Sequence, residues 1–347
     1  MQSVLEAYGF DANIASVEQY GSGLINNTWK ITSNAGEYIL QKINESVFKE
    51  PFSIAHNISF IGSYLKKNHP EYTFIAPIVS KDGKEIIYLK GEGYFRMFPF
   101  VSGSYSLDTV QTREQAFEAA RQFGRFTKLL AGINMDETKI TVPHFHDLSL
   151  RYHQFVSALK NGNKQRIAES VDLVQDLQSF SGIVDEFERL KNNPAFKLRV
   201  THHDTKISNV LFDSDGKGLC VIDLDTVMPG YFISDIGDMM RTYLSPVSEN
   251  ETDFSKIEIR EDFYKAIVRG YYTEMKDELT NTEKEYFFYA GKFIIYMQAL
   301  RFLTDYLMND VYYSTGYPMQ NFMRAKNQCT LLQKMVEKEY ALKGFFE

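Results

Sequence analysis

A polar segment between two apolar stretches carries the residue types best suited to chemistry. It reads Thr201-His202-His203-Asp204-Thr205-Lys206-Ile207-Ser208-Asn209 and runs into the apolar residues Val210 to Phe212. A polar turn, Asp213 to Gly218, then leads to a second apolar run that ends at Asp223. An Asn oxygen and an Asp carboxylate are hard ligands that suit Mg²⁺, and a carboxylate beside them can orient a hydroxyl and accept its proton.

The two apolar runs predict a β-hairpin closed by that turn. Such a hairpin would bring Asn209 and Asp223 together at its open end, with Asp204 within reach of the same end. These residues could act together on a metal-bound triphosphate, with Asp204 as the base and the other two as ligands of Mg²⁺. His202 is expected to brace the loop. Lys206 could neutralise a transferred phosphate or could be a solvated surface lysine.

The spacing His-x-Asp-x4-Asn followed by Asp matches the catalytic loop and metal-binding strand of the protein-kinase-like fold. No Ala-Pro-Glu motif follows Asp223, which argues against a protein kinase. Within this superfamily the chain resembles the aminoglycoside phosphotransferase and choline kinase group, and within that group bacterial N-acetylhexosamine 1-kinases. The resemblance covers nearly the whole chain and rests on Tyr38 to Gln41, Thr201 to Asn209, Ile222 to Gly230, Asp235 to Asp238 and Arg301 to Leu307.

The resemblance implies an α+β fold of two lobes. A small antiparallel-sheet lobe, residues 1–101, would bind the nucleotide, and a larger, mainly helical lobe, residues 102–347, would carry catalysis and the acceptor. It also implies a kinase that uses ATP and Mg²⁺ to phosphorylate the anomeric (C1) hydroxyl of N-acetylglucosamine or N-acetylgalactosamine. Asp225 would belong to the acceptor site, although its residue type also allows a second metal ligand or a turn cap.

The order of predicted elements agrees with this division. Alternating apolar runs before residue 101 predict about five antiparallel strands, one of them at Ile75 to Val79, and helical spacing predicts one helix at Pro51 to Lys66. The later helices are expected at residues 112–132, 147–161, 166–192, 260–278, 281–308 and 319–343. Thr112 and Gln115 can form a capping box. Asp235 and Asp238 precede a further apolar helix, and Asp235 is expected to organise the catalytic loop.

Nucleotide contacts are expected in the first lobe. Gly21 and Gly23 belong to a glycine-containing turn that could cover phosphates. The resemblance puts Gln41 where the family has a phosphate-binding lysine, and strand alternation sends Lys42 to the opposite face. Because the next helix offers no obvious glutamate, a neutral contact between Gln41 and Asn57 would replace the usual Lys–Glu pair.

A second group of nucleotide contacts is expected at the lobe boundary. The resemblance puts a hinge at Met97, Phe98 and Phe100, where backbone groups would pair with adenine. A plain edge strand and linker is the alternative interpretation.

The predicted acceptor residues lie on and after a strongly apolar helix. Arg301 and Asp305 are four residues apart, so they could form an ion pair along the helix or face a polar cavity. The resemblance makes Arg301, Asp305 and Tyr313 sugar contacts, whereas Tyr312 could pack inward.

Composition excludes several classes of protein. The chain has 347 residues and a net charge of -7, which disfavours a protein held mainly by nucleic-acid phosphates or anionic lipid. The two cysteines, Cys220 and Cys329, cannot form a Cys-only zinc site and fit a reducing compartment. Met1 to Phe10 lacks the features of a signal peptide, and charges interrupt the most apolar segment, Tyr286 to Leu307. We therefore expect a cytoplasmic protein, monomeric or dimeric, that needs no membrane.

Three other functions remain open. A kinase of the same fold could act on another sugar, an amino alcohol or an aminoglycoside, with Asp225, Asp305 and Asp310 facing a cationic acceptor. A metal-dependent phosphohydrolase would use His203 and Asp204, helped by a second set, His144, His146 and Asp147. A pseudokinase would bind without turnover, although all three acid and amide positions of the catalytic set are present.

Overall fold

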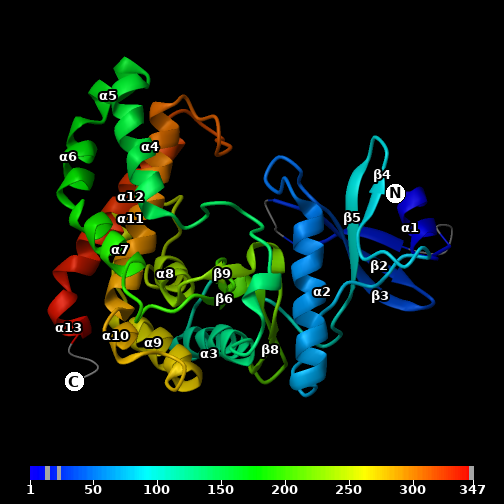
Figure 1. The fold of residues 1–347 in the computed structure, drawn as a ribbon. Coiled ribbons are helices and arrows are strands. Elements are labelled where there is room, and N and C mark those ends of the chain that lie inside the picture. Colours follow the sequence, from blue (N-terminus) through cyan, green and yellow to red (C-terminus); the bar gives the residue numbers. More distant parts are fainter. Residues whose placement is uncertain (12–15, 22–24, 344–347) are drawn as a thin grey trace. The chain divides into compact units, whose positions relative to one another are not determined.

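The computed structural model describes residues 1–11, 16–21 and 25–343, which form two compact units that interleave along the chain (Figure 1). The sheet unit comprises Met1–Ser106, Leu129–Pro143 and Val210–Pro229. The helical unit comprises Leu107–Lys128, His144–Asn209 and Gly230–Glu347. The expected lobe boundary after residue 101 stays a prediction, and two later segments join the sheet unit.

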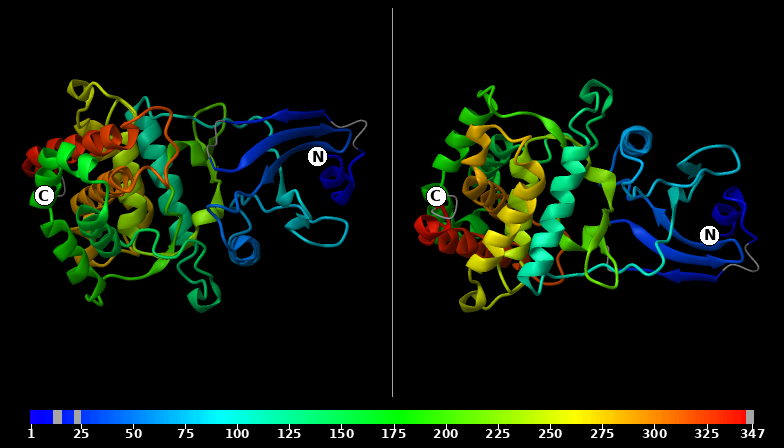
Figure 2. Two further views of the ribbon diagram at one scale, coloured as in Figure 1. Left: turned by 90° about the horizontal axis from the view of Figure 1, so that it is seen from above. Right: turned by 90° about the horizontal axis from the view of Figure 1, so that it is seen from below.

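The sheet unit is built on five antiparallel strands, as the alternation of the sequence predicts. Their spatial order is β1-β2-β3-β5-β4, and Figure 2 shows them from two further sides. The bounds are β1 Ser16–Gln19, β2 Asn27–Ser33, β3 Gly36–Lys42, β4 Ile87–Leu89 and β5 Gly93–Pro99. The α+β class is therefore confirmed.

The two faces of this sheet have different characters. One face carries Ile31, Leu40 and Met97, which form a buried core with residues of the short helix α1 (Gln2–Ala7). The register pairs Gln41 with both Thr28 and Arg96, so these three polar residues share the other face. The expected separation of Gln41 from Lys42 is thereby confirmed.

The prediction of a strand at Ile75 to Val79 is wrong. Only Ile78 forms a bridge, in which its N–H donates to the Met97 carbonyl oxygen at 2.8 Å. Pro77 lacks a backbone N–H, which explains why regular pairing does not extend along this segment.

The sheet unit also contains a long helix, the predicted hairpin and several short elements. Helix α2 spans Pro51–Asn68, and the predicted hairpin is present as β7 (Val210–Phe212) and β8 (Gly218–Val221). Its register pairs Val210 with Val221, so Asn209 precedes the first strand and Asp223 follows shortly after the second. The short helices are η1 Met135–Glu137 and η3 Leu224–Thr226, and β9 spans Met228–Gly230.

The helical unit contains most of the predicted helices. They are α3 Arg113–Leu129, α4 Leu148–Asn161, α5 Lys164–Glu169, α6 Val171–Ser179, α7 Gly182–Lys191, α8 Phe232–Tyr243, α9 Glu261–Met275, α10 Asn281–Lys284, α11 Phe287–Leu307, α12 Gln320–Glu337 and α13 Glu339–Lys343, with β6 at Arg199–Thr201, η2 at Ile207–Asn209 and η4 at Phe254–Lys256. The capping box is confirmed, because Thr112 and Gln115 exchange hydrogen bonds of 3.2 Å.

Two helix boundaries differ from expectation. The segment 166–192 forms three helices, and at the first break the Ser170 hydroxyl donates to the Arg166 carbonyl oxygen at 2.7 Å. Helix α8 begins at Phe232, so Asp235 and Asp238 lie inside it and do not cap it.

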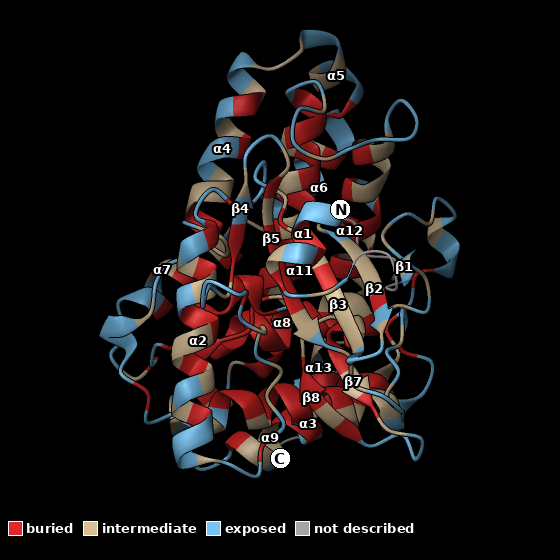
Figure 3. Cartoon of the chain, turned by 90° about the vertical axis from the view of Figure 1, so that its right-hand side faces the viewer, coloured by how far each residue is buried: buried red, intermediate tan, exposed pale blue. Residues whose placement is uncertain are grey.

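The core of the helical unit lies around α8 and α11. Helix α11 packs against α12, α8 and α4, and both α8 and α11 are buried along most of their length (Figure 3). Within residues 1–11, 16–21 and 25–343, no helix has the length and apolar character needed to span a membrane.

The crossing of α8 and α11 depends on a glycine. A Cβ atom at Gly237 would lie 2.3 Å from the carbonyl oxygen of Ala290 on α11. We expect Gly237→Ala to lower the free energy of unfolding by about 1–3 kcal/mol, because the helices must separate. Urea unfolding measures this effect.

The matched control is Gly182→Ala, since a Cβ atom at Gly182 has no neighbour within 4 Å. Equal stability of the two alanine variants would contradict the tight crossing.

Candidate active site

The contacts that the described residues make with the Asp204 carboxylate involve its Oδ2 atom. Its Oδ2 accepts a hydrogen bond from Asn209 Nδ2 at 3.2 Å and lies 3.2 Å from Lys206 Nζ. Asn209 Nδ2 also donates to the Asp204 carbonyl oxygen at 2.9 Å. These contacts leave Asp204 Oδ1 able to accept a hydrogen bond from an incoming hydroxyl.

Helix α8 fixes the backbone around Asp204. The two oxygens of Asp235 accept the N–H groups of His202 and His203 at 3.2 and 2.8 Å. Asp238 accepts the Thr205 N–H at 2.8 Å, and the Tyr243 hydroxyl donates to the Thr205 carbonyl oxygen at 2.6 Å. The expectation that Asp235 organises this loop is confirmed.

The side chain of His202 is packed, as predicted for a bracing residue. It is fully buried, and its ring lies edge-on to Phe123 of α3 with 5.1 Å between centroids. His203 adopts a left-handed backbone conformation with φ of 66° and is also buried. The loop is therefore anchored on both sides of Asp204.

Burial changes the ionisation of the α8 carboxyl groups. It raises the pKa of Asp235 from 3.8 to about 7, although the N–H groups of His203 and His202 oppose this shift. Burial also raises the pKa of Asp238, against the opposing effect of the Arg241 guanidinium. Arg241 donates to Asp238 at 3.0 Å and to Glu249 at 2.7 Å.

Asn209 and Asp223 have features that fit a magnesium ion. Because Asn209 donates its amide N–H₂ to Asp204, its Oδ1 is the atom left to bind a cation. Asp223 adopts a left-handed conformation, φ 60° and ψ 61°, which is uncommon for a residue other than glycine. Mg²⁺ in nucleotide sites takes few protein oxygens and completes its shell with water and phosphate.

The expected contact between Gln41 and Asn57 is wrong. Gln41 Oε1 accepts a hydrogen bond from Arg96 Nε at 3.0 Å, and Gln41 Nε2 donates to Thr28 at 3.4 Å. Asn57 instead donates to the carbonyl oxygens of Lys139 and Val227 at 2.8 and 2.9 Å. The β-sheet register explains the difference, since Gln41 lies directly opposite Arg96.

The other predicted nucleotide residues lie in the sheet unit. Gly21 has φ of 77° in the connection between β1 and β2, and Gly23 lies outside the described residues. Met97 is buried in the sheet core, while Phe98 and Phe100 are half-buried. Their contact with adenine stays a prediction.

Arg301 lies among aromatic rings and an amide. Its guanidinium carbon is 5.9 Å from the Phe145 ring centroid and 5.5 Å from that of Tyr313. Arg301 donates to Gln298 at 3.3 Å, and Gln298 donates to the Tyr313 hydroxyl at 3.2 Å. Tyr312, 66% exposed, does not pack inward.

The Asp305 carboxylate holds the loop that follows α11. Its two oxygens accept the N–H groups of Tyr312 and Tyr313 at 2.8 and 2.9 Å, and Asn321 Nδ2 donates to it at 3.0 Å. The ion pair considered for Arg301 and Asp305 is not among the contacts of the described residues. Direct contact of Asp305 with a sugar stays a prediction.

The alternative histidine–aspartate metal site has no ligand set in the described parts of the chain. No group of three or more His, Cys, Asp or Glu side chains there could hold a metal ion. His203 Nδ1 lies 3.4 Å from His146 Nδ1, while His144 pairs with Asp147 at 3.2 Å. Burial is the main cause that lowers the pKa of His146 well below its ordinary value, and the neighbouring His203 and Arg301 act in the same direction.

A match to a protein-family model shows which family the chain belongs to. The model of the "Phosphotransferase enzyme family" matches residues 16–277, about three quarters of the chain. The chain belongs to this phosphotransferase family. The phosphotransferase therefore transfers phosphoryl groups to hydroxyl acceptors, and its fold is the protein-kinase-like fold that the sequence predicts.

Solved structures agree with this fold. An aminoglycoside phosphotransferase from Alicyclobacillus acidocaldarius is 13% identical, with a TM-score of 0.64 and coverage of 99% of this chain and 97% of that one. A microcompartment-associated aminopropanol kinase is 17% identical, with a TM-score of 0.65 and coverage of 99% and 98%. An amicoumacin kinase in complex with AMP-PNP and Ca²⁺ is 16% identical, with a TM-score of 0.63 and coverage of 96% and 92%.

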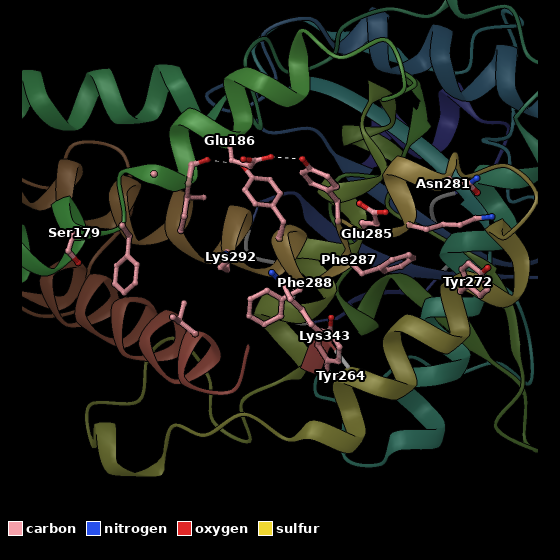
Figure 4. Close-up of a pocket in the computed structure, with 17 residues that line it drawn as sticks. Ser179, Glu186, Tyr264, Tyr272, Asn281, Glu285, Phe287, Phe288, Lys292 and Lys343 are labelled. Atoms are coloured by element: carbon pink, nitrogen blue, oxygen red, sulfur yellow. Dashed lines mark hydrogen bonds between the residues drawn. The ribbon is translucent and has the colours of Figure 1, made fainter. Parts of the chain in front are cut away.

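A cavity of about 1020 Å³ in the helical unit is lined by none of the predicted site residues (Figure 4). Its walls include Phe288, Tyr264 and Lys292, and the Tyr286 hydroxyl donates to Glu186 at its rim.

Two functional candidates were missed by sequence reasoning. Arg96 and Asn26 both contact Asp225, from β5 and from the residue before β2. The signal for Arg96 was present, because a lone arginine in the aromatic strand Tyr94 to Phe98 needs a polar partner. The partner itself could not be identified without the fold.

The raised pKa of Asp235 makes the stability of the phosphotransferase depend on pH. The folded state retains this proton more tightly than the unfolded state between pH 3.8 and about 7, so the free energy of unfolding falls as pH rises through that range. Asp235→Asn removes the titration. We expect the difference in unfolding free energy, wild type minus variant, to decrease from about pH 5 to about pH 8 in urea titrations. A constant difference would contradict this assignment.

Proposed function

We propose that the phosphotransferase transfers the γ-phosphoryl group of ATP to the anomeric hydroxyl of an N-acetylhexosamine, N-acetylglucosamine or N-acetylgalactosamine. The observation that carries the acceptor class is the surroundings of Arg301, where a guanidinium, the Gln298 amide and the Tyr313 hydroxyl lie among aromatic rings. Planar polar groups suit sugar hydroxyls and an acetamido group, and ring faces suit sugar C–H surfaces.

The catalytic roles follow from the contacts of the loop. Asp204 Oδ1 would accept the hydrogen bond of the anomeric hydroxyl and take its proton, while the Asn209 and Lys206 contacts hold Oδ2. Asn209 and Asp223 would hold Mg²⁺. When bound, this ion neutralises charge on the nucleotide phosphates. The use of a nucleotide with a divalent cation is supported by the similar amicoumacin kinase, whose complex holds AMP-PNP and Ca²⁺.

The engaged carboxylates favour a neutral acceptor over a cationic one. Asp310 pairs with Arg166 at 2.6 Å, Asp225 pairs with Arg96, and Asp305 is occupied by two backbone N–H groups. Asp225, Asp305 and Asp310 are the three acids considered above as contacts of a cationic acceptor. Arg301 and its neighbour Arg151 add positive charge, which disfavours an ammonium group nearby.

The identity of the acceptor and the position of the transferred phosphoryl group are tested with a panel of acceptors. N-acetylglucosamine, N-acetylgalactosamine, glucose, galactose, choline and kanamycin are supplied with MgATP, and ADP release is measured. We expect turnover with an N-acetylhexosamine and a product whose phosphorus NMR signal couples to an anomeric proton. Turnover only with choline or kanamycin would discard the acceptor proposal and keep the phosphotransferase.

The role of Asp204 is tested with Asp204→Asn, which keeps the side-chain size and removes the base. We expect kcat to fall by about 100-fold or more. Binding of MgADP, measured by calorimetry, should change by less than about 2-fold, because the Asp204 carboxylate is assigned to the acceptor hydroxyl. Full activity in this variant would refute the assigned base.

Charge selection is tested with glucosamine, which has an ammonium group where N-acetylglucosamine has a neutral amide. We expect its kcat/KM to be lower by about 10-fold or more near neutral pH, because like charges repel. The difference in kcat/KM between the two sugars should become smaller at higher pH, because the amine loses its proton. It should also become smaller in Arg301→Gln. Equal kcat/KM for the two sugars would contradict the role of Arg301.

A further inference from the structure

A buried polar network joins four segments of the sheet unit around Asp225. Asp225 Oδ1 pairs with the Arg96 guanidinium of β5, and Asp225 Oδ2 accepts a hydrogen bond from Asn26 Nδ2 at 2.8 Å. Arg96 Nε also donates to Gln41 Oε1 of β3 at 3.0 Å. The side chains of Arg96 and Asp225 are only 4% and 2% exposed, so solvent does not replace these contacts.

Each end of the network reaches a segment with an expected nucleotide role. Asp225 is in η3, two residues after Asp223. Asn26 follows the glycine-containing turn, and its Oδ1 accepts the Asn44 N–H at 3.0 Å while Asn44 Nδ2 donates to the Ile25 carbonyl oxygen at 3.2 Å. The end of that turn is therefore tied to the segment that presents Asp223.

A second contact fixes the other side of η3. Asn57 of α2 donates to the Val227 carbonyl oxygen at 2.9 Å. The chain from Asp223 to Val227 is thus held by a helix on one side and by Arg96 and Asn26 on the other. Such support from two sides can maintain the left-handed backbone of Asp223, which an isolated aspartate rarely adopts.

Burial of this ion pair is difficult to explain by stability alone. Removing two charges from water is costly, and an apolar pair of similar size often stabilises a fold equally well. A pair whose acid lies two residues after a metal-ligand candidate has a second use, because it can fix the position of that candidate.

We infer that the Arg96–Asp225 pair, with Asn26, positions Asp223 for the magnesium–nucleotide complex. It takes over the positioning task for which a Gln41–Asn57 contact was expected. Asp225 is thereby a positioning residue of the nucleotide side and not an acceptor contact. This inference rests on the proposed use of a magnesium–nucleotide complex but is independent of which acceptor is used.

The first test compares Asp225→Asn, Arg96→Lys and Asn26→Ala with the wild type. We expect the Kd of MgADP, measured by calorimetry, and the KM of MgATP to rise by about 10-fold or more in Asp225→Asn, since comparable supporting contacts matter to this extent. Asn26→Ala should show a smaller rise in both. The KM of the acceptor should stay within about 2-fold, because the network does not touch the acceptor residues.

The second test separates positioning from stability, since a single variant with an unpaired buried charge can fail to fold. The double variant Arg96→Met with Asp225→Leu replaces the pair by apolar side chains and should retain wild-type thermal stability more closely than either single change. Weak MgADP binding in the folded double variant would support positioning. Wild-type MgADP affinity in it would overturn the inference, because the pair would then be only structural.

The control is Lys30→Ala, which removes the ion pair of Lys30 with Glu37 between β2 and β3 at the sheet surface. It should leave MgADP affinity unchanged. An increased acceptor KM in Asp225→Asn with unchanged MgADP affinity would also overturn the inference. Calorimetry with MgADP needs no acceptor, so a failed sugar panel and a failed positioning test are distinguishable results.

Discussion

Two buried carboxylates on α8 are the constraint on which the catalytic loop depends. Asp235 and Asp238 together accept hydrogen bonds from three backbone N–H groups of this loop, those of His202, His203 and Thr205. A loop of this kind has no helix or strand partner for these donors, and leaving them unpaired inside the protein would be costly. The carboxylates therefore set the backbone path, and Asp204 obtains its position from that path.

The sheet unit also contains a buried acid that is surrounded by hydrogen-bond donors, but here the donors are side chains. There the buried acid is Asp225, and its partners are the Arg96 guanidinium and the Asn26 amide. In both units, an acid enclosed by donors holds an irregular segment that carries a predicted catalytic or metal-binding residue. The acids that a cationic substrate would need are occupied in this way, and the phosphotransferase fold is thus compatible with a neutral acceptor.

The sequence predicts features that depend on near neighbours and fails where distant partners decide. The hairpin, the spacing from Asp204 to Asn209 and the five strands of the sheet follow from local patterns, whereas the strand predicted at Ile75 to Val79 is not formed. The partner of Gln41 depends on the register with β5, which brings Arg96 opposite it from 55 residues away. Likewise the two backbone donors that occupy Asp305 come from a loop whose path no local pattern gives.

The close crossing at Gly237 has a consequence for where the helical unit can accept substitutions. Helix α11, which carries Arg301, is in contact with α8, whose Asp235 accepts the His203 N–H, so a shift of α11 would reach the loop around Asp204. In the loop after α11, Asp305 holds the backbone at Tyr312 and Tyr313, but the side chains of Val311 and Tyr317 are 80% and 43% exposed. The exposed positions of this loop can therefore accept substitutions without moving the pair of helices.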